Sequence, residues 1–72
     1  MEQKEFEDVL YTVPEVAQLL KTDEATVRRL ISKKILVGLK LGRIKVTRKE
    51  LMRFLDWASG KDFTDLDNIK EF

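Results

Sequence analysis

The sequence contains no cysteine and no histidine. These two absences together exclude disulfide bonds, thiolate chemistry, zinc fingers and imidazole acid–base catalysis. Ser32 and Ser59 are the only serines, and no histidine is present to activate either of them as a nucleophile. The sequence also lacks a glycine-rich phosphate loop and a carboxylate cluster typical of an active site. We therefore expect no catalytic residues, no metal and no cofactor, and we predict that the protein is not an enzyme.

Long apolar runs are also lacking. No stretch approaches the roughly 18 apolar residues of a membrane-spanning helix, and the acidic N-terminus lacks the basic and apolar regions of a signal peptide. With 72 residues, of which 43% are hydrophobic and 38% charged, the composition is typical of one small globular domain. We expect a cytoplasmic protein that has no membrane partner and is a monomer in solution.

Charge is distributed unevenly along the chain. Residues 1–11 carry a net charge of −3 and residues 61–72 a net charge of −2, whereas residues 12–60 carry +6. A basic block between acidic ends suits a polyanionic partner, although surface solubility explains part of such a pattern. We divide the chain into an acidic lead-in (1–9), a folded domain (10–60) and an acidic amphipathic tail (61–72).

Two helices follow each other closely in the first half of the domain. Thr12 and Glu15 match a capping box, which predicts a helix from Thr12 to about Lys21. Asp23 is well placed as the N-cap of a second helix over residues 23–34. Because the connection is so short, the two helices should cross at a steep angle. This pattern predicts a helix-turn-helix.

The second helix has two unlike faces. Val27, Leu30 and Ile31 recur at helical spacing and should face the core. The opposite face has Ala25 and Ser32 among basic residues, so it is small in its middle and positive around it. A charged outer face is common on amphipathic helices, but a small basic face also suits the close approach of a DNA groove.

Alternating residues after this helix predict a β-hairpin. Leu39, Leu41, Ile44 and Val46 are expected on the core face and Lys40, Arg43 and Lys45 on the outer face. The Gly42-Arg43 pair suggests a two-residue type II′ turn, in which glycine occupies the first turn position.

The last third of the chain predicts one long helix and a shorter one. Thr47 and Glu50 form a second capping-box pattern, and Gly60 suits a helix end, so a helix is expected over about 48–59. Its core-facing stripe is Leu51, Phe54, Leu55 and Ala58, with Trp57 at the edge of the core. In the tail, Phe63, Leu66, Ile69 and Phe72 recur every third residue and predict a short helix from about Thr64. The tail either packs on its own domain or binds a partner.

Four segments in this order resemble the excisionase family of small DNA-binding domains, which are similar in turn to the DNA-binding head of MerR-type regulators. The segments are residues 10–20 (LYTVPEVAQLL), 26–31 (TVRRLI), 40–43 (KLGR) and 48–51 (RKEL). The likeness spans about residues 10–57. It implies an α+β fold, a small winged helix-turn-helix with two helices, a two-stranded antiparallel hairpin and a third helix. The short tail helix is expected to follow. Many relatives have Gly-Val-Ser where this chain has Lys21-Thr22-Asp23.

The resemblance implies double-stranded DNA as the partner, with the second helix in the major groove and the hairpin as a wing over the adjacent backbone or minor groove. The residues implied at the recognition helix are Ala25, Thr26, Arg28, Arg29, Ser32 and Lys33. Those implied at the wing are Lys40, Arg43 and Lys45. Lys21, Arg48 and Lys49 are expected at the DNA backbone. Arg28 or Arg29 is expected to pair with guanine.

As a function, the resemblance implies sequence-specific or architectural DNA binding by an excisionase-type recombination directionality factor, associated with the nucleoid. Its tail would contact an integrase or further copies of the protein on DNA. A small transcriptional regulator with a MerR-like head is an alternative. The sequence lacks the heptads through which MerR-type regulators dimerise, which favours a stand-alone module. A protein-interaction module using the same fold is a further alternative, because folds are reused across functions.

Overall fold

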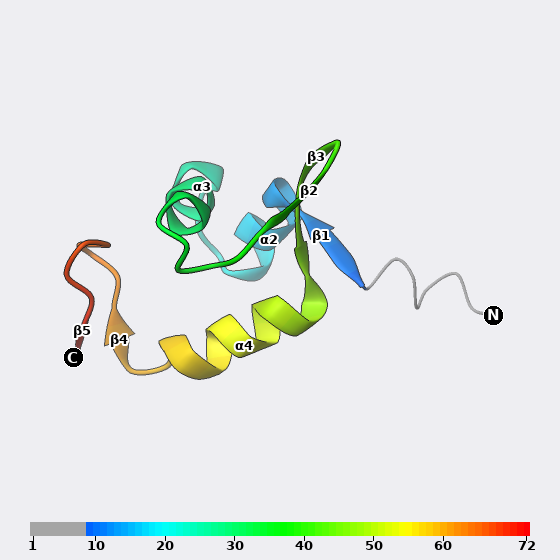
Figure 1. Cartoon of the computed structure of the whole chain (residues 1–72). Helices are drawn as coiled ribbons and strands as arrows, with labels where there is room; N and C mark the ends of the chain where they lie inside the picture. The colour runs from blue at the N-terminus through cyan, green and yellow to red at the C-terminus, as the bar shows by residue number, and fades with distance from the viewer. Residues whose placement is uncertain (1–8) are drawn as a thin grey trace.

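The structure is a computed structural model that describes residues 9–72. The predicted lead-in therefore lies outside the described residues, apart from Val9. The described residues form three helices and two small sheets (Figure 1). In chain order, these elements are β1 (Leu10–Thr12), α2 (Val13–Leu19), α3 (Glu24–Ser32), β2 (Leu39–Leu41), β3 (Arg43–Thr47), α4 (Arg48–Ala58), β4 (Lys61–Asp62) and β5 (Lys70–Glu71). This order confirms the predicted α+β winged helix-turn-helix. No helix within residues 9–72 has the length and apolar character that crossing a bilayer requires.

The helix-turn-helix begins at the predicted capping box. The Thr12 amide donates to Glu15 Oε1 at 2.8 Å, and the Glu15 amide donates to Thr12 Oγ1 at 3.3 Å. Pro14 lies in the first turn of α2, where its missing N–H leaves no helical hydrogen bond unmade. These local contacts fix where α2 starts.

α2 ends at Leu19, two residues before the predicted end, because the chain turns left-handed at Lys21. The amides of Lys21 and Thr22 donate to the carbonyls of Gln18 and Ala17, at 3.2 and 2.9 Å. This pair of bonds is a Schellman motif, which satisfies helix carbonyls that would otherwise lack donors. Lys21 is its pivot, with φ of 58°. The lysine thus adopts a left-handed conformation that glycine takes without steric cost.

α3 ends in a second Schellman motif. The amides of Lys34 and Ile35 donate to the carbonyls of Ile31 and Leu30, both at 3.0 Å. Lys34 is the pivot, with φ of 61°. The motif turns the chain sharply and delivers Leu36 to the core, where it is fully buried. Leu36 was not among the predicted core residues, because it lies in a loop outside any periodic pattern.

The sheet beside the helices has one strand more than the predicted hairpin. β1 pairs antiparallel with β3, with Tyr11 opposite Val46, so the strand order is β1-β3-β2. Three residues are too few to show a strand periodicity, and β1 forms because the edge of β3 is available to it. The Arg48 amide extends the pairing by donating to the Val9 carbonyl at 2.8 Å. β3 therefore becomes the central strand.

The hairpin turns at Gly42 alone, so the predicted two-residue Gly42-Arg43 turn is wrong. Leu41 lies opposite Arg43 and Leu39 opposite Lys45. Gly42 has φ of 74°, which glycine adopts readily. A shift of one residue in register moves a strand's side chains to the other face of the sheet. Leu39 and Leu41 are accordingly 38% and 62% exposed, and the prediction that they face the core is also wrong.

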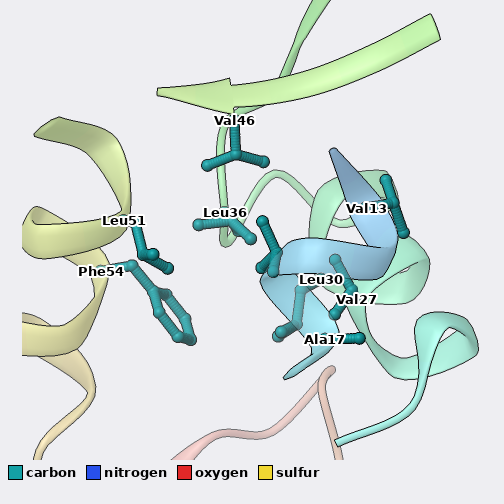
Figure 2. Close-up of a cluster of buried hydrophobic side chains, with 9 residues drawn as sticks. Val13, Ala17, Val27, Leu30, Leu36, Val46, Leu51 and Phe54 are labelled. Atoms are coloured by element: carbon teal, nitrogen blue, oxygen red, sulfur yellow. The ribbon is translucent and has the colours of Figure 1, made fainter. Parts of the chain in front are cut away.

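The core lies where α2, α3, β3 and α4 meet (Figure 2). Figure 2 shows Leu51 and Phe54 pointing from α4 toward the side chains of α2, α3 and the loop. The buried residues are Val13, Val16, Ala17, Val27, Leu30, Leu36, Val46, Leu51 and Phe54. Leu55, predicted to face the core, is 41% exposed because it lies on the solvent side of α4.

α4 is tied to the loop after α3 through Glu50. The Glu50 amide donates to Thr47 Oγ1 at 3.0 Å as predicted, but the Glu50 carboxylate accepts from the Val37 amide at 2.9 Å rather than from Thr47. The second capping box is thus only half formed. Arg53 donates to this carboxylate through Nε and Nη2, at 2.7 and 2.6 Å, and to the Ile35 carbonyl at 3.0 Å. The bonds from Arg53, assisted by the Val37 amide, hold the pKa of Glu50 below its ordinary value.

The tail forms a small hairpin of β4 and β5, so the predicted helix from Thr64 is wrong. The Asp62 carboxylate accepts from the amide and the hydroxyl of Thr64, at 2.9 and 2.6 Å. The Asp65 carboxylate accepts from the Asp67 amide at 3.0 Å. Such short-range bonds compete with helix formation, and a helix of one or two turns has an unfavourable nucleation step.

The tail packs on its own domain through aromatic residues. The ring of Phe63 lies 5.7 Å from that of Phe54 and 5.8 Å from that of Trp57, between ring centroids. Lys61 Nζ lies 4.9 Å from the centre of the Trp57 ring. Leu66 also packs against the core. The sequence left open whether the tail packs on its own domain or binds a partner, and the structure shows Phe63 and Leu66 packed on the domain.

Replacing Lys34 by glycine is expected to raise the free energy of unfolding by about 0.5–1 kcal/mol, because glycine removes the steric cost of the left-handed conformation. Urea unfolding followed by Trp57 fluorescence measures the change. Lys34→Ala is the matched control, since it removes the same charge but keeps a Cβ. Equal stability of the two variants would contradict the explanation.

Replacing Glu50 by glutamine is expected to lower the free energy of unfolding at pH 7 by about 1.5–3 kcal/mol, the typical contribution of a hydrogen bond to a charged group. Because the folded-state pKa is lowered from 4.5, the stabilisation is complete above that pH and is lost as the pH falls through the lower folded-state value. Urea unfolding between pH 3 and 7 should therefore show a flatter acid limb for Glu50→Gln than for the wild type. Glu71→Gln removes an equal charge from the exposed β5 and should change the free energy of unfolding at pH 7 by less than about 0.5 kcal/mol.

Candidate nucleic-acid interface

Asp23, the N-cap residue, fixes where α3 begins. The Asp23 carboxylate accepts from the Thr26 amide at 2.8 Å, as the N-cap prediction requires. Its hydrogen bonds with Thr26 lower the pKa of Asp23, so the group is charged at neutral pH. A negative charge here complements the positive end of the helix dipole.

α3 buries one stripe and exposes the opposite one. Val27 and Leu30 are buried, and Ile31 is half-buried, so the predicted core side of the helix is confirmed. The predicted contact residues lie on or beside the outer side, and all except the half-buried Thr26 are exposed. They are Ala25, Thr26, Arg28, Arg29, Ser32 and Lys33.

The two arginines of α3 have different partners. Arg28 Nη2 lies 3.4 Å from the Glu24 carboxylate, one helical turn earlier. Arg29 Nη2 donates to the Thr26 hydroxyl at 3.3 Å, and Arg29 forms no ion pair with any other described residue. Both bonds are long and exposed, so either guanidinium can leave its present partner and bind an anionic ligand at a small cost in free energy.

A hollow of about 500 Å³ separates the start of α3 from the hairpin tip. Its walls bring together Arg28 of α3 with Lys40 and Arg43 of the hairpin. Glu24 is the only lining residue that carries a negative charge, and Thr12, Val13, Pro14, Gly42 and Ile44 complete the walls. Three cations around one carboxylate leave the hollow with an excess of positive charge, which suits an anion.

The three predicted wing cations do not share one face. Lys40 lies opposite Ile44, whereas Arg43 and Lys45 belong to the face that carries Leu39 and Leu41. Lys45 is half-buried, and its Nζ donates to the Leu41 carbonyl at 3.3 Å. The prediction of a common outer face is wrong for the same reason as the predicted turn, because the register is shifted by one residue. Lys40 and Arg43 still meet at the hollow, beside the tip.

At the other end of α3, Lys33 is already paired. Its Nζ lies 2.6 Å from the Asp67 carboxylate of the tail. Asp67, with Asp65 nearby, raises the pKa of Lys33, which is therefore fully charged. Neither aspartate was among the predicted site residues. The uneven charge of the chain indicated an acidic tail, but a contact across 34 residues has no signal in the sequence.

The remaining predicted backbone cations lie apart from the hollow. Lys21 is exposed in the turn between α2 and α3. Arg48 and Lys49 are exposed at the start of α4, beside Val9 and Met52. The five residues of β3 separate Arg48 from the hairpin tip by about 17 Å, taking 3.3 Å per residue. The structure thus brings Arg28, Lys40 and Arg43 together at the hollow. The three predicted backbone cations lie at the edges of the domain instead.

Comparison with protein families matches the chain to a family described as a helix-turn-helix domain, over residues 10–56. The matched range runs from β1 into α4 and contains α3, the hairpin and the hollow, but not the tail. Neither the comparison with curated proteins nor that with solved structures gives a significant match.

Proposed function

Because the chain belongs to this helix-turn-helix domain family of DNA-binding domains, we propose that α3 enters the major groove of double-stranded DNA and that the β2–β3 hairpin lies over the adjacent backbone. The major groove of B-DNA admits one α-helix, and the resemblance to excisionases implies a hairpin wing beside it. The resemblance to excisionases and the family match both support this reading.

The hollow between α3 and the hairpin carries the proposal. A phosphate that enters it meets Arg28 from one side and Lys40 and Arg43 from the other. Arg28 then exchanges the Glu24 carboxylate, 3.4 Å away, for the phosphate. Neutralising phosphates releases counterions, so this contact supplies affinity without reading sequence.

Arg29 is the proposed reader of bases. It projects from the exposed side of α3 that holds Ala25 and Ser32, whose small side chains permit close approach of the helix to the groove floor. Its planar guanidinium matches the two acceptors of guanine, a contact worth about 1–3 kcal/mol of discrimination. Thr26 holds the guanidinium by a single weak bond at 3.3 Å, which orients it without neutralising it.

Lys21, Arg48 and Lys49 remain proposed contacts to the outlying backbone, and Thr26, Ser32, Lys33 and Lys45 remain proposed secondary contacts. At the level of the cell, we propose an excisionase-type recombination directionality factor that acts on DNA in the cytoplasm. In that role the protein would bend or organise attachment-site DNA and bias an integrase toward excision.

Selection of duplexes from a random library, followed by titration of the recovered site, tests the contacts. Arg29→Ala is expected to weaken binding to the recovered site by about 10-fold or more and to relax the preference for guanine. Arg43→Gln should weaken binding to all duplexes alike and reduce the slope of log affinity against log salt by about one.

Lys70→Gln, which removes a cation from the tail, is the matched control and should change affinity little. The DNA-binding function would be contradicted if the wild-type protein bound no duplex in an electrophoretic mobility-shift assay at low salt.

An excision assay tests the biological role. With the integrase and attachment sites of the element that encodes the protein, wild-type protein is expected to stimulate excision, and Arg29→Ala to abolish the stimulation. The test reads recombinant product by quantitative PCR. Promoter repression without any effect on excision would favour the small transcriptional regulator instead.

A further inference from the structure

The acidic tail reaches the proposed DNA-binding surface at one point. Asp67 of the β4–β5 hairpin contacts Lys33, which follows directly on the last residue of α3, with 2.6 Å between Nζ and Oδ1. The two residues are 34 positions apart in the sequence. Asp67 is therefore placed against a predicted contact residue by the fold and not by proximity along the chain.

Apolar contacts hold the tail in this place. Phe63 packs against Phe54 and Trp57, with centroid distances of 5.7 and 5.8 Å, and Leu66 packs against the core. Partial burial of an aromatic ring together with a leucine stabilises by more than an exposed ion pair does. The aspartate thus stays near Lys33 because its neighbours are anchored, whether or not the ion pair is formed.

We propose that the docked tail competes with DNA for Lys33: Asp67 occupies the ammonium group that a phosphate would otherwise neutralise, and so lowers the affinity of the protein for DNA. This inference rests on the proposed DNA-binding function. It assigns the tail a restraining role on the same surface, with the phosphate of a DNA backbone as the competing ligand.

Asp67 competes only weakly with DNA because its ion pair with Lys33 is exposed to solvent. The side chains of Lys33 and Asp67 are 47% and 74% exposed, so water screens the pair and its loss is readily compensated. Asp65 adds a second negative charge near the same lysine. A DNA phosphate has to displace one carboxylate and approach another. We expect removal of the Asp67 charge to strengthen DNA binding about two- to fivefold at low salt, the range of exposed ion pairs.

A double-mutant cycle on the whole chain tests the proposal. Anisotropy of a labelled duplex measures the affinities of the wild type, Asp67→Asn, Lys33→Gln and the double variant. Asp67→Asn should bind two- to fivefold more tightly than the wild type, at the scale of an exposed pair. In the Lys33→Gln background the same substitution should give only the small gain that loss of any tail charge gives, because the ammonium group that Asp67 pairs with is gone. Glu71→Gln removes an equal charge from the same tail and should give a much smaller gain.

Trp57 emission should stay constant across the set, which shows that the tail remains docked. An equal gain from Asp67→Asn with and without Lys33 would overturn the proposal, since the effect would then be general repulsion between tail and DNA. Equal affinities of Asp67→Asn and a DNA-binding wild type would also overturn it while leaving the DNA-binding function intact. Absence of binding by every variant, Asp67→Asn included, would instead contradict the DNA-binding function together with this inference.

Discussion

The arrangement of the domain depends on the central strand, β3. It pairs with β1 on one side and β2 on the other, and its Val46 is fully buried against the side chains of the helices. One end of β3 carries the hairpin tip and the other end continues directly into α4. A small domain buries only one core, so an element that joins sheet, helices and hairpin determines where all of them lie. The hollow beside α3 exists because β3 holds the tip at that distance.

Three cations of the proposed interface have weak, exchangeable partners within the protein. Arg28 has Glu24, Arg29 has the Thr26 hydroxyl, and Lys33 has Asp67. Each partner restrains a long side chain, yet none of the three bonds is buried. Exposed pairs of this kind add little stability. On binding DNA, the three cations can therefore leave these carboxylates and this hydroxyl for phosphates and bases without a large rearrangement of the domain.

The Glu50 carboxylate, which has a structural role, is partly buried and multiply bonded, in contrast to the carboxylates of Glu24 and Asp67 at the interface. Glu50 accepts three hydrogen bonds, two of them from Arg53, and joins the start of α4 to the loop that follows α3. Its side chain is only 15% exposed. The bonding and burial of the carboxylate therefore separate this ionic contact, which holds the fold, from those that remain free to exchange partners. This distinction cannot be read from residue type, because both sets consist of the same Arg, Lys, Asp and Glu.

The sequence by itself determined the elements whose signals are local. The caps at Thr12 and Asp23, the periodicity of α3 and α4 and the alternation of β3 each depend on residues within a few positions, and the structure confirms them except for Leu55 of the α4 stripe, which is exposed. Only the tertiary structure decided the features that depend on distant partners. β1 is too short to show a pattern and forms on the distant β3. The hairpin register, in contrast, is set locally by the left-handed Gly42, and the alternation of residue types alone misplaced it by one residue. The tail becomes a hairpin because Asp62 and Asp65 bond the backbone and Phe63 finds the aromatic rings of α4. The same reason governs the candidate site: helical spacing placed Arg28 and Arg29 on the outer side of α3, but folding alone brought Lys40 and Arg43 to Arg28, and Asp67 to Lys33.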